Sequence, residues 1–176
     1  LGPAWVLATA DPERISRAEL VERLPGARRH EPRLERLLVA TPQPYDGRHF
    51  PARVPALDPE AAEWLLWLGV RLFGVNVPSV DPLDSKTMVS HRLLFAAGAG
   101  LLENLDQSGV VPNRAYWLAA PPLKVVGADA APVRARVNQV LTFEGLERRE
   151  AESAGPGDIV LVNGIEEIGI GVTLTS

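Results

Sequence analysis

The chain has 176 residues, of which 46% are apolar and 23% are charged, a composition typical of folded rather than disordered proteins. Its 18 basic and 22 acidic residues give a net charge of −4 without a basic cluster, so we expect no nucleic-acid partner. Cysteine is absent, which excludes disulfide frameworks and thiolate metal sites, and no apolar run approaches the length of a membrane span. We therefore expect a cytoplasmic protein that does not bind membranes.

The first part of the chain contains signals for two strands and one helix. Residues 5–9 and 37–41 are short apolar runs, which predict buried strands. Between them, Ser16 and Glu19 have the spacing of a capping box, in which the serine caps the helix and the glutamate reaches back to the cap. The helix that begins there is expected to end at Pro25-Gly26.

A long loop and then a helix–strand unit follow. Residues 42–55 contain four prolines and no periodic pattern, which predicts an irregular loop of a kind that often carries function. Asp58 and Pro59 predict the start of a helix that runs to Gly69, and residues 71–77 form the next apolar strand. The order helix, glycine turn, strand is typical of an α/β unit.

The second half of the chain changes in character near residues 134–136. Before that point we expect a loop at 78–86 and a helix at 88–97, then strands that include 101–105, 116–120 and 123–126. After it, helix signals stop, and short apolar segments are separated by the turns Glu144-Gly145 and Asn163-Gly164. These patterns predict an α/β (mixed α+β) fold with an all-β, barrel-like C-terminal segment, divided into domains at 1–135 and 136–176.

The chain has three histidines, His30, His49 and His91, so a histidine-based site has few candidates. His91 falls early in a predicted helix, and Glu103 follows twelve residues later, after that helix and its glycine turn. A histidine and a glutamate brought together in this way could both face one metal ion. The alternative is that His91 is a partly buried helix residue and Glu103 a surface carboxylate.

Several segments of residues 1 to about 135 resemble the bacterial kynurenine formamidases of the metal-dependent cyclase family. The matching segments are Leu1–Val6, Leu72–Lys86, His91, Leu101–Leu105, Pro121–Lys124, Gly127–Asp129 and Pro132–Arg134. The segment from Pro78 to Lys86, together with the spacing from His91 to Glu103, is the most specific part of this resemblance.

The resemblance implies a binuclear metal centre, usually zinc, that activates water to hydrolyse N-formylkynurenine. It places His91 and Glu103 at two of the metal-ligand positions. The family's other ligands come from a motif of the form His-x-x-x-His-x-Asp, upstream of the segment that matches Leu1–Val6, and this sequence has no such motif. Asn76 stands where the family pattern has an acidic residue. We therefore expect a metal-free or weakly metallated fold, with zinc as the candidate ion of an incomplete site.

Residues 136–176 resemble part of the β-barrel domain of the translational GTPase BipA. The matching segments are Arg136-Val137, Leu141–Arg148, Ala154–Val160 and Gly164–Gly171. No phosphate-binding loop ending in Lys-Ser or Lys-Thr exists in the chain, so no nucleotide cofactor is expected. The opening strands of such a barrel are missing, and the open strand edges are expected to pair with another surface.

Two truncated family fragments joined near Arg134 favour the hypothesis of a chimeric or recombined protein that folds but has no complete active site and no catalytic activity. One alternative is a residual metal-dependent amide hydrolase of the kynurenine formamidase type, with Asp81 or His49 assisting His91 and Glu103. Another is a ribosome-binding barrel module. Large apolar residues, including Trp64 and Trp67, and the open strand edges predict self-association into a homodimer or a larger assembly.

Overall fold

The computed structural model describes residues 2–24, 34–43, 50–121, 136–138, 140–144, 147–150 and 160–162. The chain divides into a larger unit, Ala4–Ala115, and a smaller unit that combines Leu1–Pro3 with Tyr116–Ser176. The domain boundary predicted near residues 134–136 borders residues outside the described ranges, and it stays a prediction. The strand predicted at 123–126 also lies outside them.

The larger unit is built on parallel strands. These are β1 (Gly2–Ala8), β3 (Arg36–Ala40), β5 (Leu72–Val75) and β6 (Gly100–Leu102), in the spatial order β6-β5-β3-β1. In register, Trp5 lies opposite Leu37, and Leu37 lies opposite Phe73. Apart from Arg36 at the start of β3, the strands are apolar, as is typical of strands in a parallel sheet. Four of the strands predicted from the sequence are thereby confirmed.

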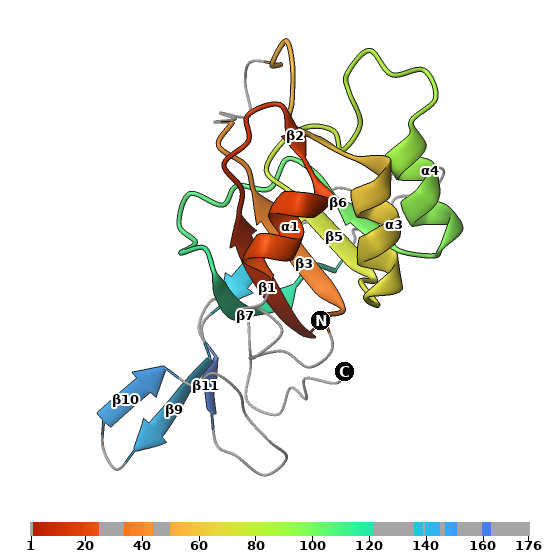
Figure 1. Ribbon diagram of the computed structural model, residues 1–176. Coiled ribbons are helices and arrows are strands. Elements are labelled where there is room, and N and C mark those ends of the chain that lie inside the picture. The colour runs from red at the N-terminus through yellow and green to blue at the C-terminus, as the bar shows by residue number, and fades with distance from the viewer. Residues whose placement is uncertain are drawn as a thin grey trace. The chain divides into compact units, whose positions relative to one another are not determined.

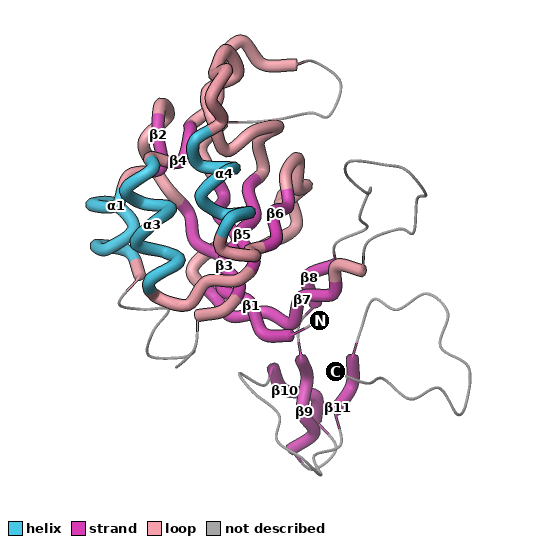
Figure 2. The backbone as a smooth tube through the Cα atoms, turned by 90° about the vertical axis from the view of Figure 1, so that its right-hand side faces the viewer, coloured by secondary structure: helices cyan, strands magenta, loops and turns pink. Residues whose placement is uncertain are grey.

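Three helices lie on one face of this sheet, as the two perpendicular views in Figures 1 and 2 show. They are α1 (Arg17–Arg23), α3 (Pro59–Trp67) and α4 (Val89–Ala96), and α3 packs against both of the others. The core contains Leu20, Leu65 and Leu94 from the helices together with Leu7 and Phe73 from the strands, all without measurable exposure. The mixed α/β fold predicted from the sequence is confirmed. None of the helices described is long and apolar enough to cross a bilayer.

The capping box at the start of α1 is only half formed. Ser16 Oγ accepts a hydrogen bond from the Glu19 backbone N–H at 3.2 Å, as predicted. The Glu19 carboxylate does not reach back to Ser16; Oε1 accepts from the Ala10 backbone N–H at 2.6 Å and pairs with Arg23 at 3.0 Å. The Glu19 side chain therefore links α1 to the segment that follows β1, and it does not complete the capping box.

Helix α3 begins after the predicted N-cap residue, Asp58, and ends at Trp67, two residues before the predicted Gly69. Asp58 makes no side-chain capping bond, and its carboxylate lies 3.9 Å from Arg14 Nη1. At the other end, Gly69 adopts φ +95°, a conformation that favours glycine, and it donates its N–H to the Leu66 carbonyl at 3.0 Å. This tight turn leads directly into β5.

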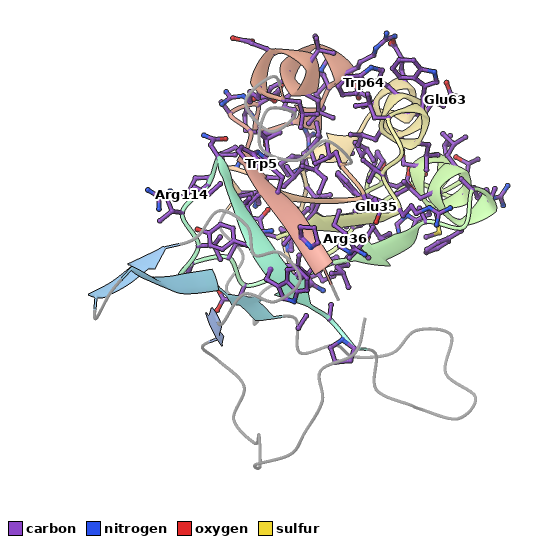
Figure 3. The ribbon with its side chains drawn as sticks, turned by 90° about the horizontal axis from the view of Figure 1, so that it is seen from below. Trp5, Glu35, Arg36, Glu63, Trp64 and Arg114 are labelled. Carbon is purple, nitrogen blue, oxygen red and sulfur yellow. The ribbon has the colours of Figure 1, made fainter. Side chains whose placement is uncertain are left out.

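The start of β3 is polar on its exposed side. Glu35 and Arg36 lie next to each other there, with Glu35 Oε2 3.3 Å from Arg36 Nη1, and Figure 3 shows their side chains together. The Glu35 carbonyl also accepts from the backbone N–H groups of Arg71 and Leu72, at 2.7 and 2.9 Å. These bonds set the register in which β5 enters the sheet.

The smaller unit contains only strands in its described part. In it, β7 (Arg114–Ala119) pairs antiparallel with β8 (Arg136–Asn138) through residues 117–119. A second, antiparallel sheet has the order β10-β9-β11, with β9 at Val140–Glu144, β10 at Glu147–Glu150 and β11 at Val160–Val162. Glu144 pairs with Glu147, so the strands on either side of the predicted turn are antiparallel partners, while residues 145–146 lie outside the described residues. The second predicted turn, at residues 163–164, is outside the described residues.

Candidate metal centre

The site forms where two neighbouring parallel strands end at the same edge of the sheet. Beyond β5 the chain continues through residues 76–88 into α4, and beyond β6 it continues directly into Glu103. Backbone hydrogen bonds from Asn104 to Val77 (2.9 Å) and from Leu105 to Val75 (3.1 Å) hold the two strand ends together. In open α/β sheets this carboxyl edge is where ligands bind.

The imidazole ring of His91 lies between two carboxylates. Its Nδ1 is 2.7 Å from Asp81 Oδ2, and its Nε2 is 3.1 Å from Glu103 Oε1. His91 is 8% exposed and Asp81 is 3% exposed. The ring also makes an edge-on contact with Phe95, one turn further along α4, at a centroid separation of 5.9 Å. The spacing of twelve residues between His91 and Glu103 thus becomes a direct contact.

The Asp81 carboxylate accepts from the helix as well as from the ring. Its Oδ1 accepts from the Ser90 backbone N–H and its Oδ2 from the His91 backbone N–H, each at 3.0 Å. Burial raises the pKa of this carboxyl, but the hydrogen bonds from the His91 backbone, the His91 ring and Ser90 hold the pKa below its ordinary value. Asp81 is therefore a buried carboxylate kept in its charged form.

The pKa of the Glu103 carboxyl shifts in the opposite direction from that of Asp81. Its Oε1 accepts from the Val80 backbone N–H at 2.9 Å, which fixes the side chain across the loop that contains Asp81. Burial raises the pKa of Glu103, and the charge of His91 and the bond from Val80 only partly offset it. A cation bound between Glu103 and His91 would favour the charged form of this carboxylate.

The structure separates the sequence-predicted candidates into three groups. His91 and Glu103 come together. Asp81 lies on the opposite ring nitrogen from Glu103, so Asp81 cannot bind the same ion as Nε2, in contrast to the alternative in which it assists as a ligand. His30 and His49 lie outside the described residues. The contact of Asp81 with the ring carries no sequence signal, since a spacing of ten residues across a proline-containing loop does not fix a distance.

Asn76, which stands where the family resemblance implies an acidic residue, closes a loop. Its Oδ1 accepts from the Thr41 backbone N–H (2.9 Å) and hydroxyl (2.8 Å), and its Nδ2 donates to the carbonyls of Thr41 and Gln43, both at 3.2 Å. The amide provides both donors and acceptors here, and a carboxylate could provide only acceptors. Asn76 therefore joins the ends of β3 and β5 at the site edge.

The donors present fit a metal ion in part. Imidazole nitrogen and carboxylate oxygen are both good zinc ligands, and the second ring nitrogen of His91 is already hydrogen-bonded to a carboxylate, as metal-binding histidines usually are. Within the described part of the chain, however, no group of three or more histidine, aspartate and glutamate side chains could hold a metal. Among the described residues, His91 and Glu103 are the two candidate ligands.

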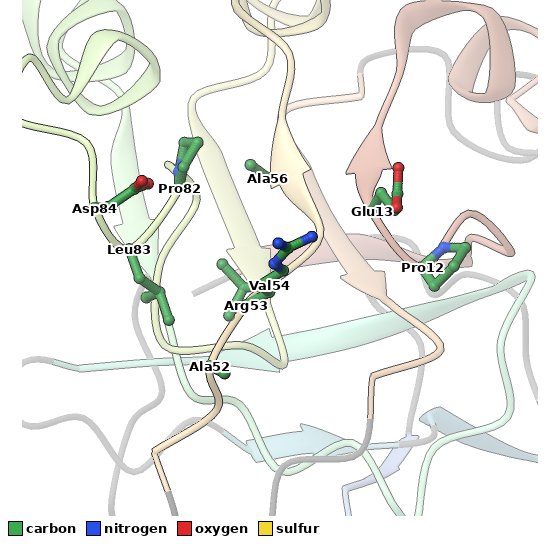
Figure 4. Close-up of a pocket in the computed structure, with 9 residues that line it drawn as sticks. All are labelled: Pro12, Glu13, Ala52, Arg53, Val54, Ala56, Pro82, Leu83 and Asp84. Atoms are coloured by element: carbon green, nitrogen blue, oxygen red, sulfur yellow. The ribbon is translucent and has the colours of Figure 1, made fainter.

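A pocket of about 570 Å³ opens beside the loop that follows Asp81. Its lining includes Pro12, Glu13, Arg53, Val54, Leu83 and Asp84. In the close-up of Figure 4, Asp84 and Glu13 lie at opposite sides of the view with Arg53 between them. The pocket therefore combines aliphatic surface with side chains of both charges.

Kynurenine formamidases are among the curated proteins similar to this chain. The enzyme of Geobacillus thermodenitrificans is 38% identical over 140 residues, which are 80% of this chain and 64% of the relative. The enzyme of Bacillus cytotoxicus is 41% identical over 138 residues, 77% of this chain and 61% of the relative. The chain thus spans less than two thirds of the length of these relatives. No protein-family model matches it.

Solved structures share the fold. A potential metal-dependent hydrolase with cyclase activity has a TM-score of 0.62 at 24% identity, covering 78% of this chain and 64% of that one. A predicted metal-dependent hydrolase from Bacillus stearothermophilus has a TM-score of 0.59 at 25% identity, covering 78% and 63%. An isatin hydrolase bound to thioisatinate has a TM-score of 0.56 at 21% identity, covering 76% and 58%.

The hypothesis of a chimera without catalytic activity is wrong. Curated relatives named as one enzyme match 80% of the chain, and structures with the same fold are described as hydrolases. Because the chain spans only 64% of the relatives' length, the lack of the upstream ligand motif does not argue against an enzyme. None of the proteins named here is a BipA, so that resemblance stays a prediction. Over 80% of its length, the chain is similar in sequence to bacterial kynurenine formamidases.

Proposed function

We propose that this chain belongs to a metal-dependent amide hydrolase that removes the formyl group of N-formylkynurenine. The observation that carries the proposal is the approach of His91 Nε2 to Glu103 Oε1, at 3.1 Å, at the carboxyl edge of the parallel sheet. The names of the curated relatives support the reaction, and the structural neighbours described as metal-dependent hydrolases support the need for a metal.

His91 and Glu103 would hold the metal ion, and zinc is the ion we propose. A bound divalent ion supplies Lewis-acid activation of water and of an amide carbonyl. His91 would bind through Nε2, because its Nδ1 is engaged by Asp81. Glu103 would bind through its carboxylate, which the Val80 N–H holds in place. Catalytic zinc sites use three protein ligands, so the remaining ligands are expected from outside the described residues or from a second copy of the chain.

The proposal is tested by metal content and hydrolysis together. Zinc-supplemented protein should release kynurenine from N-formylkynurenine, followed by absorbance, and a chelator should abolish the release. His91→Ala and Glu103→Gln should each lower kcat/KM by more than about 100-fold, beyond the 10–100-fold typical of changes outside the ligand shell. Asp84→Asn removes an exposed carboxylate of the same loop and should leave metal content unchanged. Unchanged zinc content in both ligand variants would contradict the proposal.

Self-association and a cytoplasmic location stay predictions from the sequence. Trp67 is 77% exposed and Phe95 is 57% exposed, so apolar surface is available on the helix layer. A homodimer or larger assembly is expected, and light scattering of the purified protein measures it.

A further inference from the structure

Helix α4 begins without a cap of its own. Its N-cap residue, Met88, has left-handed backbone angles (φ 46°, ψ 56°) and makes no side-chain capping bond. The first N–H groups of a helix have no partner within the helix, so another acceptor has to be provided. Asp81 provides it from the preceding loop, because its two oxygens accept from the backbone N–H groups of Ser90 and His91 at 3.0 Å.

The same carboxylate also meets the ring that α4 carries. Asp81 Oδ2 lies 2.7 Å from His91 Nδ1, a length typical of a charge-assisted hydrogen bond. A carboxylate can only accept, so the hydrogen of this bond belongs to Nδ1. When the ring is neutral, its lone pair is then on Nε2, and the half-buried Glu103 carboxyl, 3.1 Å away, has to be the proton donor of that second contact in the metal-free chain.

We propose that Asp81 is a positioning residue that fixes both the tautomer and the orientation of the His91 ring, so that Nε2 is presented to the metal. The part that concerns the metal rests on the proposed function, whereas the tautomer is a property of the metal-free chain. Asp81 does not touch the metal or the substrate in this proposal, and it acts through His91.

Asp81 is itself held firmly enough to act in this way. Ser79 Oγ accepts from the Asp81 N–H at 3.1 Å and donates to the Asp81 carbonyl at 2.8 Å. Ser90 Oγ donates to the Leu57 carbonyl at 2.7 Å, which anchors the first turn of α4 to the neighbouring segment. With Phe95 against the ring, these contacts leave His91 one arrangement in which both nitrogens have partners.

The tautomer is measured by nitrogen NMR of the metal-free protein with the ring in its neutral form. With His30→Gln and His49→Gln in place, His91 is the single imidazole of the chain. The wild-type ring should be protonated on Nδ1. In Asp81→Asn the amide can donate to Nδ1, so the ring should change to the form protonated on Nε2, and zinc affinity should fall by about 10–100-fold.

Two controls separate positioning from a merely structural effect. Ser90→Ala removes the bond to Leu57 and leaves Asp81 and the ring unchanged, so it should lower stability without changing the tautomer. Asp84→Asn removes an exposed carboxylate from the loop that follows Asp81, and it should change neither the stability nor the tautomer of His91.

Each outcome decides the matter. An Nε2-protonated ring in the folded wild-type protein overturns the proposal even if Asp81→Asn fails to fold. Unchanged tautomer and zinc affinity in folded Asp81→Asn also overturn it. If the wild-type protein binds no zinc but shows the tautomer change, the proposed function fails and the positioning of the ring by Asp81 stands.

Discussion

The helix-covered core and the carboxyl edge of the sheet are built in different ways, although both belong to the larger unit. The core consists of many apolar side chains, such as Leu7, Leu65 and Phe73, that are fully buried and share their contacts. At the edge, four residues are held by a few directional bonds between 2.7 and 3.1 Å: Asp81, Ser90, His91 and Glu103. The core therefore tolerates small rearrangements, and the edge depends on individual atoms.

The largest effect on stability is expected in the core. Phe73 is fully buried on β5, and Phe73→Ala should lower the free energy of unfolding by about 3–5 kcal/mol, through lost burial and the cavity that remains. Urea unfolding followed by circular dichroism measures this loss. A loss of unfolding free energy below about 1 kcal/mol would contradict the claim that the core side chains stabilise the fold through shared packing, since Phe73 is among the largest buried side chains.

An intermediate, pH-dependent effect is expected at the edge. The folded-state pKa of Asp81 lies below its ordinary value of 3.8, so the stability that Asp81 contributes is fully present above that pH. It is lost as the pH falls through the lowered pKa, because the carboxyl then takes up a proton in the folded state too. The stability difference between the wild type and Asp81→Asn should therefore shrink as the pH falls below about 4. Urea unfolding midpoints of both proteins, measured at a series of acidic pH values, give this stability difference. A stability difference that grows as the pH falls would contradict the prediction.

The smallest effect is expected at the start of α1, where one bond is involved. Ser16→Ala removes the acceptor for the Glu19 N–H and should cost about 1 kcal/mol. Ser16→Thr keeps the oxygen and is the matched control. Equal stability of the two variants would show that the cap contributes nothing measurable, since the Glu19 carboxylate, bonded to Ala10, is unaffected by either change.

The same contrast explains what could be predicted from the sequence. Apolar runs and turn residues predict the elements of the core, because burial acts on patterns: β1, β3, β5 and the helix from Pro59 to Gly69 all follow from them. Two-residue strands do not produce a pattern, so β2 (Arg14–Ile15) and β4 (Ala56–Leu57), which pair in parallel, were not anticipated. Their pairing depends on where the loops meet.

Polar contacts were predicted least well. Asp58 is the N-cap residue of α3, as predicted, but its side chain makes no capping bond. The return bond predicted for the Glu19 carboxylate is wrong, because that carboxylate accepts from Ala10 and pairs with Arg23. At the site, the spacing between His91 and Glu103 suggested a shared ion, yet only the folded backbone shows that Asp81 takes the other ring nitrogen. A carboxylate ten residues away can lie on either side of a ring, and the loop geometry decides between them.

The bonds from Asp81 to the start of α4 have a consequence for how this region can vary. They close residues 82–89 into a loop whose two ends are joined at the base, independently of what lies between. Because the entropic cost of lengthening a closed loop rises slowly, residues could be inserted or exchanged within it at a modest cost in stability. Leu83 and Asp84, on the wall of the adjacent pocket, are part of that loop. The shape and charge of the pocket can thus change from one protein to another while the His91 ring stays in place.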